Sequence, residues 1–316
     1  MRDYNASIVL DFARTVAVLA LIGVTLMSAA RAQVPRKQLV AHRGASAYAP
    51  EHTREAYTLA IEQGADFVEQ DLAVSKDGVL VCIHDLTLER TTDVETVFPE
   101  RSVPAVLNGK PVRRWLVADF TLAELKRLDA GSWFDTKFAG ARIPTFQEAI
   151  DLIRGQAGMY PELKDPAFYR ERGVSPEQLL ADVLGKNRLE ADPKTPVIIQ
   201  SFDERTVRRL RDILPRVPRV WLVEAKWADR VDTADKVRAI ATWASGLGPN
   251  KQLVAARPEI VAWAHAAGLT VTPWTFRASN TGTYPSVTAE METFLYEYGV
   301  DALFTDNPDK FPRLKK

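Results

Sequence analysis

The chain has 316 residues, of which 46% are hydrophobic and 26% are charged, a composition typical of an ordinary globular protein. Lys plus Arg and Asp plus Glu both total 41, so the formal net charge is zero and no global field attracts nucleic acid or an anionic membrane. We therefore expect no nucleic-acid partner, and any recognition of phosphate must be local. The single cysteine, Cys82, excludes an intramolecular disulfide and a cysteine-rich zinc site.

The N-terminal segment has the features of a leader for export. Residues 16–27 read VAVLALIGVTLM, an apolar run too short to span a bilayer comfortably. The small-x-small sequence at residues 30–32 then predicts a signal peptide over residues 1–32 and a mature chain that begins at Gln33. We expect a periplasmic or secreted protein with no stable membrane span after cleavage. An uncleaved N-terminal anchor and a mis-assigned start codon are the alternatives.

After residue 33, short β-rich runs alternate with amphipathic helical stretches. The runs that predict strands are residues 38–42, 67–73, 79–83, 158–163, 197–201, 219–223, 270–276 and 302–305. The stretches that predict helices are residues 53–63, 122–128, 145–154, 176–186, 204–214 and 258–267. This alternation indicates a parallel sheet covered by helices.

The length of the mature chain selects among parallel folds. An eight-stranded barrel typically has about 250 residues, so we expect an α/β fold of the (β/α)₈ TIM-barrel class in one domain, residues 33–316. A doubly wound open sheet is the alternative, but the chain has no GxGxxG or GxxxxGK[ST] phosphate loop to support it. Residues 86–120 are polar, contain three prolines and lack a clear period, which predicts an inserted segment on the barrel rim after the first hairpin.

Two carboxylates on the second predicted strand indicate a cation site. Glu69 and Asp71 are two residues apart, so both side chains point to one face of the strand. Carboxylates held together repel each other unless a shared proton or a cation neutralises them. A hard divalent ion is the simplest solution, because Ca²⁺ and Mg²⁺ take oxygen ligands.

The turn that follows this strand is expected to bring a histidine to the same face. Asp77 and Gly78 form a strong two-residue hairpin signal. With these two residues as the loop, Lys76 lies opposite Val79 and Asp71 lies opposite His84. Directly opposed residues share a face, so the sequence predicts His84 beside the carboxylates.

Further chemistry-bearing residues come at or near the ends of other predicted strands, where a parallel barrel builds its active site. His42 ends the first strand, and Glu162 and Lys164 come at i and i+2 near the end of another. Glu162 fits a third carboxylate ligand, while the cations at Lys164 and Arg43 fit a phosphate. Three residues late on strands are candidates for lining the pocket, with core packing as the alternative for the aromatic ones: Gln200, Phe202 and Trp274.

Six short motifs in this order resemble the glycerophosphodiester phosphodiesterase family. They are HRG at 42–44, PEHT at 50–53, EQD at 69–71, HD at 84–85, PELK at 161–164 and FTDNPD at 304–309. The resemblance covers essentially all of the chain after the leader, and it is strongest to the exported bacterial type. It implies a (β/α)₈ barrel with an insertion after the first hairpin.

The resemblance also implies roles for individual residues. It gives general acid and base roles to His42 and His84. It gives ligation of one divalent metal, Ca²⁺ or Mg²⁺, to Glu69, Asp71 and Glu162, and phosphate contacts to Arg43 and Lys164. The commoner family motif has Asn where this chain has His52, so the role of His52, like that of the adjacent Glu51, is open.

The expected activity is metal-dependent hydrolysis of glycerophosphodiesters, such as glycerophosphocholine and glycerophosphoethanolamine, to glycerol 3-phosphate and an alcohol. The metal, Lys and Arg would offset the charge that concentrates in the transition state, and the two histidines would move the protons. A phospholipase D-like lyase that acts on lysolipids is one alternative. A non-catalytic binding protein on the same barrel is the other.

Overall fold

The computed structural model describes residues 36–313. From Lys37 onward, the described residues group into one compact unit. The predicted signal peptide, residues 1–32, lies outside the described residues and stays a prediction. Among the residues that are described, every helix is too short or too polar to cross a bilayer.

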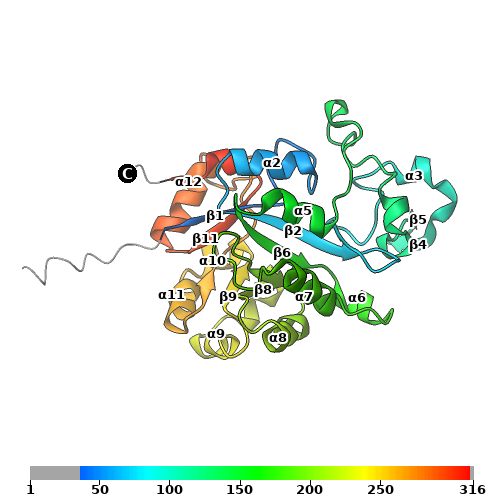
Figure 1. The fold of residues 1–316 in the computed structure, drawn as a ribbon. Helices are drawn as coiled ribbons and strands as arrows, with labels where there is room; N and C mark the ends of the chain where they lie inside the picture. The colour runs from blue at the N-terminus through cyan, green and yellow to red at the C-terminus, as the bar shows by residue number, and fades with distance from the viewer. Residues whose placement is uncertain (1–35, 314–316) are drawn as a thin grey trace, which may run out of the picture. The chain divides into compact units, whose positions relative to one another are not determined.

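Eight parallel strands follow one another around a barrel in chain order (Figure 1). They are β1 (Gln38–Ala41), β2 (Phe67–Val74), β6 (Gly158–Leu163), β7 (Ile199–Ser201), β8 (Arg219–Val223), β9 (Gly246–Pro249), β10 (Thr270–Val271) and β11 (Ala302–Thr305). From β1 to β10 each pairs in parallel with the next, and β11 pairs in parallel with β1. The barrel closes between the segment that begins with β10 and β11, where Phe276 N donates to Phe304 O at 2.8 Å and Asp301 N donates to Val271 O at 3.0 Å. The predicted (β/α)₈ barrel is confirmed.

One barrel strand was absent from the sequence-based expectation. β9 reads GLGP, which lacks the β-branched and aromatic residues that mark a strand. The structure explains its glycines by close packing against neighbouring strands. A Cβ atom at Gly246 would lie 2.3 Å from Thr270 Oγ1, and one at Gly248 would lie 2.5 Å from a Leu222 methyl group.

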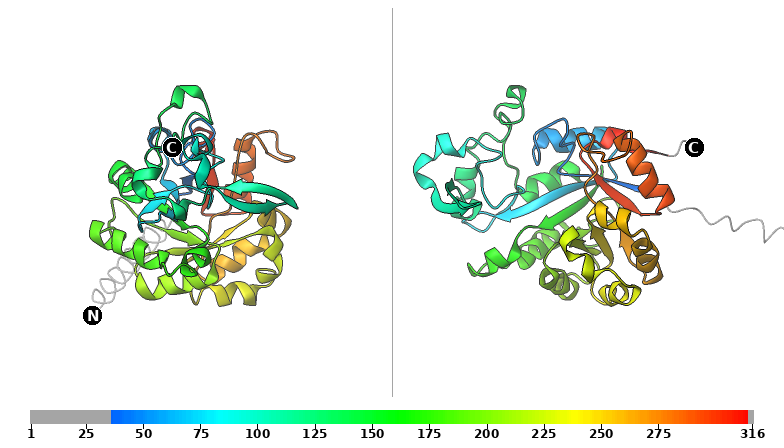
Figure 2. Two further views of the ribbon diagram at one scale, coloured as in Figure 1. Left: turned by 90° about the vertical axis from the view of Figure 1, so that its right-hand side faces the viewer. Right: turned by 180° about the vertical axis from the view of Figure 1, so that it is seen from behind.

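Helices cover the outside of the barrel (Figures 1 and 2). They are α2 (Arg54–Glu62), α5 (Phe146–Ile153), α6 (Pro166–Arg170), α7 (Pro176–Asn187), α8 (Glu204–Ile213), α9 (Ala234–Ile240), α10 (Lys251–Ala256), α11 (Glu259–Ala266) and α12 (Val287–Glu292). Several begin at a capping side chain that accepts a backbone N–H, for example Thr53, Thr145 and Asp203, which satisfies amides that have no partner within the helix. Each βα loop thus ends at a defined residue beside the barrel mouth.

Residues 86–120, the predicted insertion, hold a short helix and a separate hairpin. These elements are α3 (Val94–Val97) and the two-stranded sheet of β4 (Val103–Leu107) and β5 (Lys110–Arg114). Leu88, Trp115 and Phe120 are buried within this region. Figure 1 shows it beyond the carboxyl end of β2, which is the end of the barrel where βα loops build a site.

The hairpin of β2 and β3 (Leu80–Cys82) differs from its prediction by one residue. The observed register pairs Leu72 with Cys82 and Val74 with Leu80, so Asp71 lies level with Ile83 rather than with His84. The reason is a three-residue loop: Ser75 N donates to Val79 O at 2.9 Å, and Gly78 has a φ of 81°. A three-residue loop with glycine in the left-handed region is a common hairpin form. His84 reaches the site only because β3 ends at Cys82 and the chain turns after it.

The first loop of the barrel depends on one glycine. Gly44 follows His42 and Arg43 and has a φ of +85°. A Cβ atom there would lie 2.7 Å from the carbonyl carbon of Ala56 and 2.8 Å from its Cβ. The loop after β1 therefore packs directly against helix α2, which sets the position of His42 and Arg43.

We expect Gly44→Ala to destabilise the protein by about 2 to 5 kcal/mol, because the strain of a left-handed alanine adds to a backbone clash. Gly64→Ala is the matched control. Gly64 has a φ of +80° but nothing within 4 Å of its would-be Cβ, so only the strain, about 1 to 2 kcal/mol, should appear. Urea unfolding of both variants measures the difference, and equal losses would contradict this account of the loop.

Candidate active site

The carboxyl ends of the barrel strands surround a cavity of about 130 Å³. The residues that the sequence predicted for catalysis, metal binding and substrate binding all line it: His42, Arg43, Glu69, Asp71, His84, Glu162, Lys164, Gln200, Phe202 and Trp274. Leu222, Thr275, Arg277 and Phe304 complete the lining. The two residues left open, Glu51 and His52, do not line the cavity but contact residues that do.

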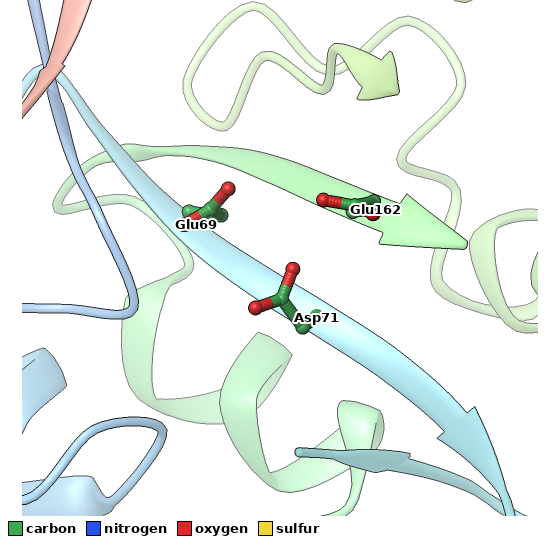
Figure 3. A group of neighbouring side chains, drawn as sticks. All are labelled: Glu69, Asp71 and Glu162. Atoms are coloured by element: carbon green, nitrogen blue, oxygen red, sulfur yellow. The ribbon is translucent and has the colours of Figure 1, made fainter. Parts of the chain in front are cut away.

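Three buried carboxylates form the floor of this arrangement. Glu69 and Asp71 lie on β2, and the parallel pairing of β2 with β6 sets Asp71 level with Glu162. One oxygen of each carboxylate lies within 4.8 Å of the others. Figure 3 shows the three side chains converging between the two strands. This is a spacing that a single cation can bridge.

Burial and mutual repulsion perturb the acidity of all three groups. Burial, followed by repulsion from Asp71, raises the pKa of Glu162 to about 8 even though Lys164 opposes it. Burial and the other two carboxylates raise the pKa of Glu69 well above its ordinary value. Burial acts in the same direction on Asp71, but Lys164 and His52 outweigh it and hold the pKa of that carboxyl well below its ordinary value. Without a cation, the cluster therefore retains protons near neutral pH.

The donor set fits a hard divalent metal. Among the described residues, Asp71 Oδ1 is buried and has no hydrogen-bond partner. An unpartnered buried carboxylate oxygen is costly, and a cation between the three carboxylates would satisfy it. Because all the ligands are oxygens, Ca²⁺ and Mg²⁺ suit this site better than metals that prefer sulfur or nitrogen.

His42 is held in place by a carboxylate on the last strand-to-helix loop. Its Nδ1 lies 2.6 Å from Asp306 Oδ1, and its Nε2 lies 3.8 Å from Glu69 Oε2. Burial and the neighbouring Arg43 lower the pKa of His42 to about 4 despite the attraction of Asp306. The ring is therefore neutral at neutral pH, and with Nδ1–H donating to Asp306, Nε2 is free to accept a proton.

Arg43 connects the carboxylates to the loop that follows β1. Its backbone N donates to Glu69 Oε2 at 2.9 Å, its Nη1 donates to Glu51 Oε1 at 3.0 Å, and its Nε lies 3.4 Å from Asp71 Oδ2. His52 Nε2 lies 2.8 Å from Asp71 Oδ2, and its Nδ1 lies 2.9 Å from Tyr57 Oη. Glu51 and His52 thus act one step behind the cavity, by holding Arg43 and Asp71.

His84 belongs to a chain of ion pairs that reaches Arg43. Its Nδ1 lies 2.6 Å from Asp85 Oδ1, and Asp85 Oδ2 accepts from Arg90 Nε at 2.5 Å. Arg90 also contacts both oxygens of Glu51, at 2.7 and 3.0 Å. Arg90 comes from the insertion, so this segment fixes the position of His84 relative to the loop after β1.

The opposite wall of the cavity combines cationic, amide and aromatic groups. Lys164 Nζ lies 2.9 Å from Glu162 Oε1, and Gln200 Nε2 donates to Glu69 Oε1 at 2.7 Å. Trp274 Nε1 donates to Gly248 O at 2.7 Å, which fixes its ring beside Phe202 at a centroid distance of 5.4 Å. The wall therefore places the positive charge of Lys164 beside an apolar aromatic surface.

Four charged contributors to the site were not among the residues expected from the sequence. They are Asp85, Arg90, Arg277 and Asp306. Asp306 and Asp85 carried a signal, since each lies within a motif that supported the family resemblance and each follows a strand. Arg90 and Arg277 carried none, because they lie in irregular segments whose course only the folded chain reveals.

Comparisons with known proteins identify the family of the chain. Residues 42–310 match the glycerophosphoryl diester phosphodiesterase family model. A glycerophosphodiester phosphodiesterase of Bacillus subtilis is 37% identical over 288 residues, which cover 88% of this chain and 86% of that protein. One of Arabidopsis thaliana is 32% identical over 315 residues, covering 87% of this chain and 84% of that protein.

Solved structures of the family superimpose on the barrel. The glycerophosphodiester phosphodiesterase of Agrobacterium tumefaciens has a TM-score of 0.65 at 30% identity and covers 87% of this chain and 98% of that one. A phosphodiesterase of Oleispira antarctica, solved with the product sn-glycerol-3-phosphate, has a TM-score of 0.66 at 29% identity and covers 87% of this chain and 95% of that one.

The carboxylate cluster predicts how the stability of the metal-free protein depends on pH. The pKa of Glu162 is about 8 in the folded protein against an ordinary value of 4.5, so the folded state binds the extra proton and loses stability as pH rises through this window. The lowered pKa of His42 has the opposite effect and makes stability rise with pH. This rise is complete above the ordinary pKa of 6.5, so it does not affect the higher pH range. With chelator present, unfolding free energy should therefore fall by about 2 kcal/mol between pH 6.5 and 8.5.

Urea unfolding at several pH values measures this slope. Glu162→Gln should flatten it. Glu177→Gln should leave it unchanged, because Glu177 is equally buried but pairs with Arg170 away from the cavity. A metal-free protein whose stability is constant or rises over this range would contradict the account of the cluster.

Proposed function

The chain belongs to the glycerophosphoryl diester phosphodiesterase family and is a glycerophosphodiester phosphodiesterase, and from this premise we propose that it works with one divalent metal and two histidines. The observation that carries the proposal is the meeting of three buried carboxylates, two histidines and two cations around one cavity. The products are glycerol 3-phosphate and the head-group alcohol.

Glu69, Asp71 and Glu162 would hold the metal, and the unpartnered oxygen of Asp71 supports this assignment. When bound, a divalent ion supplies positive charge that offsets the charge developing on the phosphoryl oxygens. Carboxylate ligands must be ionised to bind a cation, so the raised pKa values of Glu69 and Glu162 make binding stronger at higher pH. Calcium and magnesium both fit an all-oxygen set.

His42 is suited to accept the proton of the attacking hydroxyl. Burial keeps its ring neutral at neutral pH, its Nε2 faces the carboxylates, and Asp306 stabilises the imidazolium that forms. As the new P–O bond forms, the bond from phosphorus to the head-group oxygen breaks. His84 donates a proton to that oxygen, and the contact of its Nδ1 with Asp85 orients the ring.

Arg43 and Lys164 bind the phosphate. Both are almost fully enclosed and lie beside the carboxylates, so their charge acts in a medium that screens it little. The attractions of Glu162 and Asp71 outweigh burial and raise the pKa of Lys164, which keeps the ammonium charged over the whole working range. The two cations stabilise a phosphodiester that gains charge in the transition state.

The predicted leader indicates that the enzyme is exported. The apolar run of residues 16–27 and the small-x-small sequence at 30–32 fit a cleaved signal peptide, and we propose that the enzyme acts in the periplasm or outside the cell. Its substrates there would be small glycerophosphodiesters such as glycerophosphocholine and glycerophosphoethanolamine.

Release of glycerol 3-phosphate from glycerophosphocholine tests the metal. We expect release to stop with chelator and to return with added Ca²⁺ or Mg²⁺. Glu69→Gln should raise the metal concentration needed for half-maximal rate by about tenfold or more, while Glu177→Gln should not. Undiminished release in chelator would refute metal dependence, and a cyclic phosphate from lysophosphatidylcholine would indicate a lyase instead.

Substitution of the histidines tests the proton transfers. His42→Ala and His84→Ala should each lower kcat by about 10² to 10⁴, the usual worth of a general acid or base, with the melting temperature still raised by metal. His265→Ala is the control, because His265 lies half-exposed on α11 and pairs with Asp301 outside the cavity. Near-unchanged kcat in either cavity variant would remove that histidine from the mechanism.

A further inference from the structure

A groove of about 510 Å³ continues from the cavity across three successive strand-to-helix loops. We name it the aromatic groove. Its outer lining consists of Asp165 and Phe168 after β6, Phe202 and Asp203 after β7, and Glu224 and Trp227 after β8. It shares Glu162, Lys164 and Phe202 with the cavity. A substrate whose phosphate lies between Arg43 and Lys164 therefore has a direct path into it.

Three of the carboxylates that line the aromatic groove are paired with cations, Glu162 with Lys164 among them, and one is not. Four carboxylates and one ammonium group line it. Asp203 pairs with Arg170 and Glu224 pairs with Lys226, but Asp165 is exposed and has no ion-pair partner in the part of the chain that the structure describes. A free carboxylate at its rim attracts a cation.

Aromatic rings lead from the cavity into this groove. Trp274 lies in the cavity wall, Phe202 lies 5.4 Å from it, and Trp227 lies 6.3 Å beyond Phe202, measured between ring centroids. Phe202 and Trp227 each already have an ammonium group over the ring, from Lys164 at 5.7 Å and from Lys226 at 5.3 Å. Both rings thus already hold a cation at the distance of a cation–π contact, and a head-group ammonium would take the place of Lys226 at Trp227. The Lys226 side chain is 66% exposed, so its ion pair with Glu224 costs little to break.

The other extension of the cavity has the opposite character. A pocket of about 190 Å³ on the far side of Trp274 is lined by Lys251 and Arg277 together with amide and hydroxyl groups, and no carboxylate lines it. Lys251 and Arg277 are paired with Glu290 and Asp306, so this pocket offers a cationic head group no unpaired carboxylate, whereas the aromatic groove offers Asp165. The aromatic groove and this pocket thus differ in the charge that they favour on a substrate group.

We propose that the aromatic groove is the subsite for a cationic head group, a quaternary or primary ammonium attached to the phosphate through a short alcohol. This assignment rests on the proposed phosphodiesterase function. The ammonium lies among Phe202, Trp227 and the carboxylates, and the alcohol oxygen stays beside His84 and Lys164. The enzyme then prefers diesters of choline or ethanolamine over diesters with a neutral head group.

The test compares kcat/KM for glycerophosphocholine with that for glycerophosphoglycerol, whose head group is neutral. Trp227→Leu keeps an apolar side chain but removes the ring, and it should lower the choline-to-glycerol ratio about threefold to tenfold. Trp227→Phe should restore most of the ratio. Asp165→Asn should lower it about twofold to fivefold at low salt and less at high salt. Trp133→Leu, at an exposed tryptophan outside the groove, should leave both rates unchanged.

A second measurement needs no variant. Choline should inhibit hydrolysis of glycerophosphocholine at about tenfold lower concentration than 3,3-dimethylbutan-1-ol, which has the same shape without the charge. Equal inhibition by the two alcohols, or a ratio insensitive to Trp227 and Asp165 in an active enzyme, would overturn the subsite alone. Failure to hydrolyse either diester with metal present would overturn the proposed function and the subsite with it.

Discussion

Repulsion among three buried carboxylates is the constraint on which the rest of the site depends. Glu69, Asp71 and Glu162 lie within 4.8 Å of one another, and their charges are unfavourable together unless cations surround them. The fold supplies cations from two sides, with Arg43 on the loop after β1 and Lys164 beyond the end of β6. A divalent metal bound as proposed would complete the neutralisation. A bound cation and a bound phosphate would therefore lie in the same cluster of charged side chains.

The barrel makes this arrangement possible because consecutive strands are neighbours in space. The register of β2 against β6 brings Asp71 level with Glu162 although 91 positions separate them in the chain. The parallel pairing of β1 with β11, which sets Ala41 level with Thr305, brings Asp306 to His42. The insertion adds a second set of contacts, because Arg90 binds both Asp85 and Glu51. These contacts fix the position of His84 relative to Arg43. Both histidines are thereby oriented by carboxylates that lie outside the cation site.

Charge is also distributed unevenly around the cavity mouth. Carboxylates and aromatic rings gather on the loops after β6, β7 and β8, whereas Lys251 and Arg277 lie on the other side of Trp274. The reacting centre itself must bind an anion, so the proposed head-group subsite assigns discrimination between substrates to these outer loops. This division matches a general property of barrels, in which strand ends carry the chemistry and loops vary the substrate.

The sequence by itself determined the fold class and ten of the fourteen residues that line the cavity. The period-2 pairs Glu69/Asp71 and Glu162/Lys164 and the strand-end position of His42 depend on local backbone geometry, which short stretches of sequence encode. Only the tertiary structure decided the glycine-rich strand β9, the one-residue shift of the β2–β3 hairpin, and the ion pairs of Asp306 and Arg90. Each of these depends on contacts between distant segments: close packing excludes side chains at Gly246 and Gly248, and the course of an irregular loop decides which carboxylate Arg90 meets.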